Sequence, residues 1–290
     1  MNPPPLSPPL SLGLCSWSTR QIEEPALRAA FQPLGINILH LALSPLAELD
    51  PSEQTHALAQ FRASPLQISA GMISFPGEDY RTLATIRATG GLVPDDLFPQ
   101  RHALLTACAH LAHQLNLRLV STHVGFIPAQ SDRPNFDRLR DRLASIADQF
   151  AALNLTLLFE TGQETADTLA DFLTVLNRPN VGVNFDPANM ILYGKGDPVA
   201  AIRTLAPWIQ HVHAKDARLV SPPPNDPTAW RAHEAPLGQG DAHLPQVLTA
   251  LKQIHYPGPL IIEREATSSR TQEILADLTY LRSLIPKNEN

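Results

Sequence analysis

The central stretch of the chain decides the fold: it reads LTLLFE at residues 155–160 and VGVNFD at residues 181–186. Each segment is a short, almost continuous apolar run that ends in an acidic residue. Such runs are typical of strands that are buried on both faces, as in a parallel sheet covered by helices. Between the two runs, NRPN at residues 177–180 is a clear helix stop. The pattern therefore predicts a strand, a helix and a second strand.

The same alternation continues outward in both directions. Six further apolar runs predict strands at residues 12–16, 36–42, 66–70, 117–123, 209–213 and 259–263. Amphipathic patterns predict helices at residues 137–153, 244–254 and 272–285. Eight strand–helix alternations predict an α/β fold, the (β/α)8 TIM barrel, as a single domain over residues 1–290. An open doubly wound sheet is the alternative, and its dinucleotide-binding form is disfavoured because no GxGxxG follows the first run.

Composition agrees with an enzyme-sized barrel. The chain has 290 residues, 43% of them hydrophobic, and a net charge of -6. This acidic balance argues against nucleic acid as a partner, because affinity for phosphate backbones rests on clustered Lys and Arg. The Pro-rich N-terminal segment, residues 1–10, lacks the basic start of a secretory signal, and no apolar run reaches the roughly 18 residues of a membrane span. We expect a cytoplasmic protein with no membrane partner, and buried thiols at Cys15 and Cys108.

Two predicted loops are longer than usual. Residues 75–98 follow the third predicted strand and should contain a short extra helix. Residues 216–241 follow the seventh predicted strand and include SPPP at residues 221–224. Long loops after the strands of a barrel often form lids or substrate walls, so both are expected at the functional mouth.

Polar residues terminate the last four predicted strands, namely Glu160, Asp186, His213 and Glu263. The C-terminal ends of barrel strands converge on one face, so these four side chains can meet around one point. Three carboxylates and one imidazole suit a hard or borderline ion such as Mn²⁺, Mg²⁺, Co²⁺ or Zn²⁺. Without a cation, burying the carboxylates together would force proton uptake. One acid at a strand end is more often a helix cap, so the prediction depends on all four together.

The motifs resemble those of the xylose-isomerase-like TIM barrels, a family of sugar phosphate isomerases and epimerases that includes ketose 3-epimerases and inosose dehydratase. The resemblance is carried by FETGQE (159–164), NFDPANM (184–190), HVHAKD (211–216), PLGQGD (236–241) and IE (262–263). It implies one divalent ion, with Mn²⁺ favoured, bound by the four residues that end the strands. It also implies that Glu160 and Glu263 act as the acid/base pair, which removes a proton next to a carbonyl and returns one to the opposite face.

The resemblance implies an enzyme: a metal-dependent sugar isomerase or epimerase that acts on a ketose or related keto-sugar through a metal-stabilised enediolate. Two departures from the ketose 3-epimerases keep a second reaction open. Asn189 stands where those enzymes often have a histidine, and Arg218 does not match the spacing of their arginine. Lys215 is more similar to the dehydratase and lyase branches. The alternative is therefore a metal-dependent lyase or dehydratase acting on a keto-sugar, an inosose or a 3-keto glycoside.

Two further classes fit less well. A DNA-repair enzyme of the AP endonuclease type shares the barrel, but it would carry more metal ligands and a basic face. A non-catalytic sugar-binding barrel would not need two opposed carboxylates on a metal. Barrels of this group often form homo-oligomers, which is an expectation by analogy alone.

Supporting residues are predicted around the metal ligands. Six are expected to contact the substrate, namely His123, Asn189, Lys215, Arg218, Trp17 and Glu164. Each has a plainer alternative, such as a structural histidine, lid packing or a helix cap. His211, two residues before the metal-binding histidine, is expected to lie behind the metal ligands, deeper in the barrel, and to support them. His40 is given a structural role.

Overall fold

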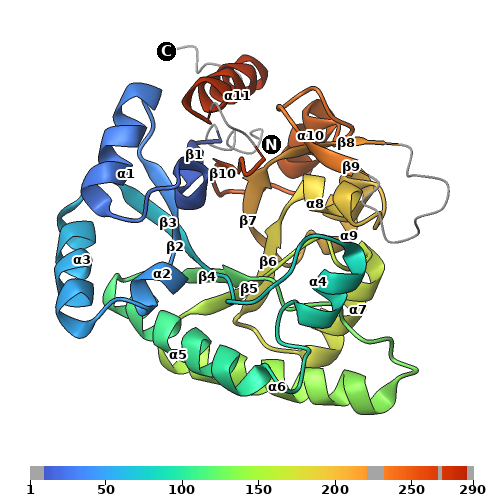
Figure 1. The fold of residues 1–290 in the computed structure, drawn as a ribbon. Coiled ribbons are helices and arrows are strands. Elements are labelled where there is room, and N and C mark those ends of the chain that lie inside the picture. The colour runs from blue at the N-terminus through green and yellow to red at the C-terminus, as the bar shows by residue number, and fades with distance from the viewer. Residues whose placement is uncertain (1–9, 221–231, 267–269, 286–290) are drawn as a thin grey trace, which may run out of the picture.

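The computed structural model describes residues 10–220, 232–266 and 270–285. Eight parallel strands close into a barrel, and the helices lie around its outside (Figure 1). The strands, in barrel order, are β1 (Leu12–Cys15), β10 (Leu260–Ile262), β7 (Ile209–Ala214), β6 (Val181–Phe185), β5 (Thr156–Glu160), β4 (Leu119–Thr122), β3 (Gln67–Ile73) and β2 (Ile38–Ala42). Because β1 pairs with both β2 and β10, the TIM barrel is confirmed and the open sheet is wrong.

Most helices cover the outer face of the barrel, and α8 (Pro187–Leu192) lies at its mouth, where it lines the cavity. They are α1 (Glu24–Phe31), α2 (Ser44–Ala47), α3 (Pro51–Ala63), α4 (Leu83–Thr89), α5 (Phe98–Gln114), α6 (Arg133–Ala152), α7 (Ala166–Leu176), α8 (Pro187–Leu192), α9 (Pro198–Leu205), α10 (Leu244–Gln253) and α11 (Arg270–Leu284). Helix α6 buries Phe136, Leu139, Leu143 and Phe150, a spacing that places them on one face. Helix α7 ends at the predicted stop, where Asn177 adopts a left-handed conformation with φ 46°. No helix of the described residues is long and apolar enough to cross a membrane.

The two long loops contain regular structure. Helix α4 is the extra helix predicted within residues 75–98. The region 216–241 is not wholly a loop, because strands β8 (Asp216–Leu219) and β9 (Ala232–Ala235) form an antiparallel hairpin. The SPPP segment lies outside the described residues, as do residues 1–9 of the Pro-rich N-terminal segment.

Asp216 organises the chain that follows the hairpin. Its Oδ1 accepts the backbone N–H groups of Ala217 at 2.9 Å and Ala242 at 3.0 Å. Its Oδ2 accepts those of Gly238 at 2.9 Å and Gly240 at 3.0 Å. One buried carboxylate therefore fixes the PLGQGD segment beside the barrel mouth.

Candidate metal centre

The four predicted ligand residues meet at the C-terminal end of the barrel. Glu160 is the last residue of β5, His213 lies near the end of β7, and Asp186 and Glu263 directly follow β6 and β10. All four are buried, and one ligand atom from each lies within 4.8 Å of the others. His213 Nδ1 lies 3.6 Å from Glu160 Oε1, 3.6 Å from Asp186 Oδ2 and 3.3 Å from Glu263 Oε2.

Two atoms of this cluster indicate that it fits a cation. Asp186 Oδ2 and His213 Nδ1 are buried and have no hydrogen-bond partner among the described residues. Buried polar atoms without hydrogen-bond partners are rare in folded proteins, and a bound ion is one physical reason for them. An ion that both atoms bind would satisfy them, and a donor set of three carboxylates and one imidazole suits a divalent metal. The residues present therefore fit one divalent cation.

The charges of the cluster are strongly coupled. Burial lowers the pKa of His213, but the nearby Cys15, Glu160 and Glu263 outweigh it and hold that pKa well above its usual value. Burial raises the pKa of Asp186 to about 6, against the opposing effect of Lys215 and His213. Burial also opposes ionisation of Glu263, but Lys215 and His213 lower its pKa well below the usual range. Because a metal ion needs the lone pair of His213 Nδ1, a proton competes with it there, and the raised pKa of His213 makes metal binding weaker as the pH falls.

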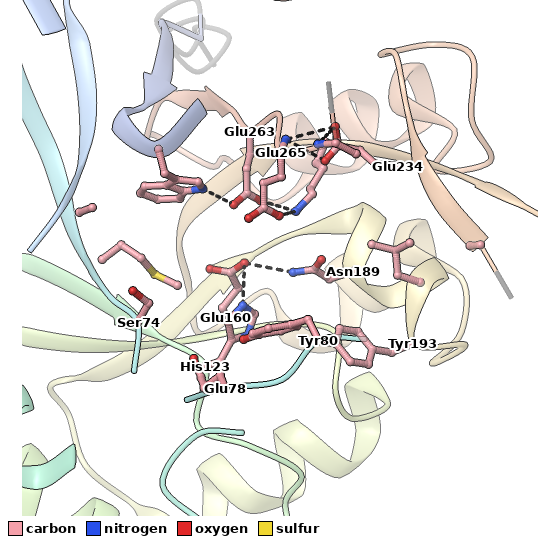
Figure 2. A pocket seen from close by; sticks show the side chains of 17 residues that line it. Ser74, Glu78, Tyr80, His123, Glu160, Asn189, Tyr193, Glu234, Glu263 and Glu265 are labelled. Atoms are coloured by element: carbon pink, nitrogen blue, oxygen red, sulfur yellow. Dashed lines mark hydrogen bonds and ion pairs between the residues drawn. The ribbon is translucent and has the colours of Figure 1, made fainter. Parts of the chain in front are cut away.

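Glu160 and Glu263 both line a cavity of about 610 Å³, and their carboxylates point toward each other (Figure 2). Trp17 Nε1 donates to Glu263 Oε1 at 2.7 Å, and Lys215 Nζ donates to Glu263 Oε2 at 2.8 Å. On the other side, Asn189 Nδ2 donates to Glu160 Oε1 at 3.0 Å. Each glutamate is therefore held in a fixed orientation by its own set of donors.

Four of the six predicted substrate-binding residues line this cavity, namely Trp17, His123, Asn189 and Lys215. His123 Nε2 lies 3.5 Å from Glu160 Oε1, and the Nδ1 atom of His123 is buried with no hydrogen-bond partner among the described residues. Lys215 is buried and also donates to Glu265 at 2.8 Å. Burial lowers the pKa of Lys215, but Glu263 and Glu265 raise it well above its usual value. Lys215 is therefore an ammonium group at the cavity wall.

The structure places the other two predicted residues outside the cavity. Arg218 lies on the exposed part of β8 and donates to the backbone oxygen of Gln239, because the hairpin turns its side chain away from the barrel mouth. Glu164 turns away from the metal ligands and accepts the backbone N–H of Ile127 at 3.0 Å. Burial raises the pKa of Glu164 to about 7.

His211 packs edge-on against His213, with ring centroids 6.0 Å apart. Its Nδ1 lies 2.9 Å from Asn184 Oδ1, and Asn184 Nδ2 donates to Glu160 Oε2 at 3.0 Å. His211 therefore supports Glu160 through Asn184. The shortest hydrogen-bond contact of His213 is with His40, whose Nδ1 lies 2.9 Å from His213 Nε2. The prediction assigned His40 a structural role; a lone imidazole inside the apolar run of residues 36–42 indicates a buried polar group but does not identify its partner.

Sequence reasoning also missed several residues of the cavity wall. They are Met72, Glu78, Tyr80, Tyr193, Glu234 and Glu265. Most belong to loops and to the hairpin, where no apolar strand run marks the orientation of the side chains. They give the cavity an aromatic side and an acidic rim.

The family described as xylose isomerase-like TIM barrel matches residues 78–284. A solved structure of a xylose isomerase domain protein from Planctomyces limnophilus is 30% identical, with a TM-score of 0.83 over 96% of this chain and 97% of that chain. D-psicose 3-epimerase from Clostridium cellulolyticum H10 shares the fold at 16% identity, with a TM-score of 0.68 over 95% of this chain and 99% of that one.

Among curated proteins, 3-dehydroshikimate dehydratase from Bacillus anthracis is 38% identical over 80 residues, which are 26% of this chain. That match spans 28% of the length of the dehydratase, so the likeness to it is local. The match to the family covers most of the barrel and all four strand ends that carry the cluster. The chain therefore belongs to the xylose isomerase-like TIM barrel family.

Proposed function

We propose that this protein is a divalent-metal-dependent isomerase or epimerase that moves a proton at a carbon next to the carbonyl of a keto-sugar. The observation that carries the proposal is the pair of buried carboxylates, Glu160 and Glu263, which face one cavity from separate strands (Figure 2). Proton transfer on opposite faces of a carbon needs two such groups. A purely binding site needs neither.

The residues that would hold the metal are Glu160, Asp186, His213 and Glu263. When bound, a divalent cation supplies electrophilic catalysis, polarising substrate oxygens and offsetting the negative charge that develops on them. The donor set of oxygens and one imidazole accepts Mn²⁺, Mg²⁺, Co²⁺ or Zn²⁺, and Mn²⁺ is our favoured ion.

The side chains around the cluster have distinct roles in the proposed reaction. Glu160 takes the proton from the carbon, since Asn184 and Asn189 donate to it and hold its carboxylate in place. Glu263 carries the second proton transfer on the opposite face, and the Lys215 ammonium orients it through a hydrogen bond of 2.8 Å. After each turnover Glu160 releases its proton to solvent and Glu263 regains one from solvent. The apolar bodies of Trp17 and the other aromatic residues of the wall exclude water from the sugar face.

A second candidate reaction is a metal-dependent lyase or dehydratase, which starts with the same proton abstraction. Two observations favour it. Lys215 is an ammonium group at the cavity wall and is placed to protonate a departing hydroxyl. The local likeness to 3-dehydroshikimate dehydratase at 38% identity points the same way. The two reactions differ only in where the electron pair of the broken C–H bond goes.

Turnover in D₂O separates these proposals. The metal-loaded protein is incubated with free ketoses, sugar phosphates, inososes and 3-keto glycosides, and the products are identified by NMR and mass spectrometry. Deuterium at the carbon next to the carbonyl, with an epimer or isomer appearing, supports the leading proposal. Loss of water or of an aglycone supports the lyase. A metal-loaded protein that exchanges no proton in any of these substrates contradicts both.

A further inference from the structure

His40 lies on β2 inside the barrel, below the cluster of carboxylates, and its side chain is fully buried. Its Nδ1 is 2.9 Å from His213 Nε2, and its Nε2 is 3.1 Å from Ser121 Oγ. We propose that His40 is a positioning residue for His213: it accepts the Nε2–H of His213 and thereby leaves the Nδ1 lone pair of His213 facing the metal site. The inference rests on the proposed metal centre and adds to it a residue that is not itself one of the four metal ligands.

The directions of the hydrogen bonds follow from the chemistry of the two rings. His213 Nδ1 faces the three carboxylates, so a cation binds there only if the remaining ring proton sits on Nε2. That proton is then donated to His40 Nδ1. The proton of His40 must sit on its own Nε2, where Ser121 Oγ accepts it. The Ser121 hydroxyl donates in turn to the Gly71 carbonyl at 3.3 Å or to Met72 Sδ at 3.0 Å.

The other neighbours of His213 cannot take over this role. Asn184 Nδ2 lies 3.2 Å from His213 Nε2, but an amide nitrogen only donates, and it is engaged with Glu160 Oε2 at 3.0 Å. The amide oxygen of Asn184 faces His211. Cys15 Sγ is 3.7 Å from His213 Nε2, and a thiol sulfur is a weak acceptor. His40 is therefore the strong acceptor in reach of His213 among the described residues.

Neighbouring rings hold His40 in this orientation. The rings of Trp17 and His211 pack edge-on against it, with centroid distances of 5.0 Å and 4.6 Å. Metal-binding histidines commonly donate their second N–H to a carboxylate or a carbonyl. In this site the neutral ring of His40 accepts that N–H instead. No fourth buried carboxylate is therefore needed next to Glu160, Asp186 and Glu263.

Two substitutions separate hydrogen bonding from packing. Leu approximates the volume of the ring but accepts no hydrogen bond, whereas Asn is smaller and places its amide oxygen near the position of His40 Nδ1. Mn²⁺ affinity is measured for the wild type, His40→Leu and His40→Asn by calorimetric titration at one pH. His40→Leu should weaken binding by about 10- to 100-fold, whereas His40→Asn should keep most of the affinity. A packing role predicts the reverse order, and that order would overturn the proposal.

A second measurement needs no variant to fold. The wild-type protein is labelled with ¹⁵N-histidine and loaded with diamagnetic Mg²⁺ or Zn²⁺, and the imidazole tautomers are read by ¹H–¹⁵N NMR. The proposal expects His40 protonated at Nε2 and unprotonated at Nδ1, and His213 protonated at Nε2. A His40 ring that carries its proton on Nδ1 contradicts it.

These outcomes distinguish the proposed metal centre from the proposed role of His40. If the wild type binds no divalent cation, the proposed metal centre is wrong and the role of His40 falls with it. If the wild type binds Mn²⁺ and His40→Leu binds it equally well, the metal centre stands and the His40 proposal alone is wrong. Thermal unfolding of the metal-free variants reports separately on any loss of packing.

Discussion

Glu160 and Glu263 contribute to one cluster, yet each is held by different neighbours. Glu160 accepts hydrogen bonds from two asparagines, whereas Glu263 accepts them from Trp17 and Lys215. Amide substitution keeps the shape of either side chain and removes its ability to move a proton. Glu160→Gln and Glu263→Gln should therefore each lower kcat by about 10²- to 10⁴-fold, as measured with the substrate found in the D₂O screen.

The matched control for this pair is Glu23→Gln, which alters an exposed carboxylate outside the cavity. It should leave kcat unchanged. Full turnover in both Glu160→Gln and Glu263→Gln would show that the proposed acid/base assignment is wrong.

Glu164 supplies a second prediction at the residue scale. Burial raises its pKa to about 7 in the folded protein, whereas an unfolded glutamate titrates near 4.3. The folded state therefore binds a proton that the unfolded state releases, and stability from this group falls as the pH rises from about 4 to about 7. Glutamine does not titrate, so Glu164→Gln keeps its stability as the pH rises. Its free energy of unfolding should exceed that of the wild type by about 2 to 3 kcal/mol at pH 8 but by little at pH 5.

The measurement is thermal or urea unfolding of both proteins at pH 5 and pH 8, with EDTA present so that metal binding does not contribute. Other buried acids titrate equally in both proteins, so the difference between them isolates Glu164. Unfolding curves that keep the same separation at both pH values would contradict the raised pKa.

At the scale of elements, the β8–β9 hairpin and the segment behind it depend on Asp216. Each of its two carboxylate oxygens accepts two backbone N–H groups. Asp216→Asn replaces one of these oxygens with an amide NH₂ group, so two backbone N–H groups lose their acceptor. The expected cost is about 2 to 4 kcal/mol of unfolding free energy, measured by urea denaturation.

Asp137→Asn is the control for that substitution, because Asp137 lies on the solvent side of α6 and forms surface ion pairs with Arg133 and Arg140. Such pairs contribute less than about 1 kcal/mol. If both substitutions lower the free energy of unfolding by the same amount, Asp216 does not organise the hairpin as described.

The strands were predictable because each is an apolar run buried on both faces of the barrel wall. The β3 strand shows a limit of this pattern. It continues past the predicted end at residue 70 to Ile73. Gly71 is needed there because an added Cβ would come within 2.4 Å of Leu43 Cδ1. The β8–β9 hairpin was missed because DARL and AHEA are too polar and too short to signal strands.

The cluster of four was predictable for a related reason. Glu160, Asp186, His213 and Glu263 each stand where an apolar run stops, and barrel closure then brings strand ends together. The role of His40 was not predictable, because its partner lies across the barrel interior and only the closed structure brings the two rings together. Sequence order alone does not show which interior side chains of β2 and β7 meet.

At the scale of the whole molecule, metal binding and stability should be linked. A cation that binds only the folded state stabilises it by about 2.7 kcal/mol when its free concentration is 100 times Kd. Thermal unfolding of the EDTA-treated protein should therefore shift upward on addition of Mn²⁺. Asp186→Asn should abolish the shift, since it removes one ligand charge, yet its amide oxygen can still accept the Asn189 N–H that caps α8.

The control for this experiment is the stability of the Asp186→Asn protein without metal. It should be at least as stable as the metal-free wild type, because one buried carboxylate has been removed from a cluster of three. An Mn²⁺-dependent shift of unchanged size in this variant would mean that the ion binds elsewhere on the molecule.

The most direct test of the central claim is the position of the ion itself. Crystals of the wild-type protein grown with Mn²⁺ would be measured at the manganese absorption edge, and an anomalous difference map would be calculated. The account predicts one strong peak among Glu160, Asp186, His213 and Glu263, with His213 approaching it through Nδ1. Full-occupancy manganese at another place, with no peak among these four side chains, would contradict it.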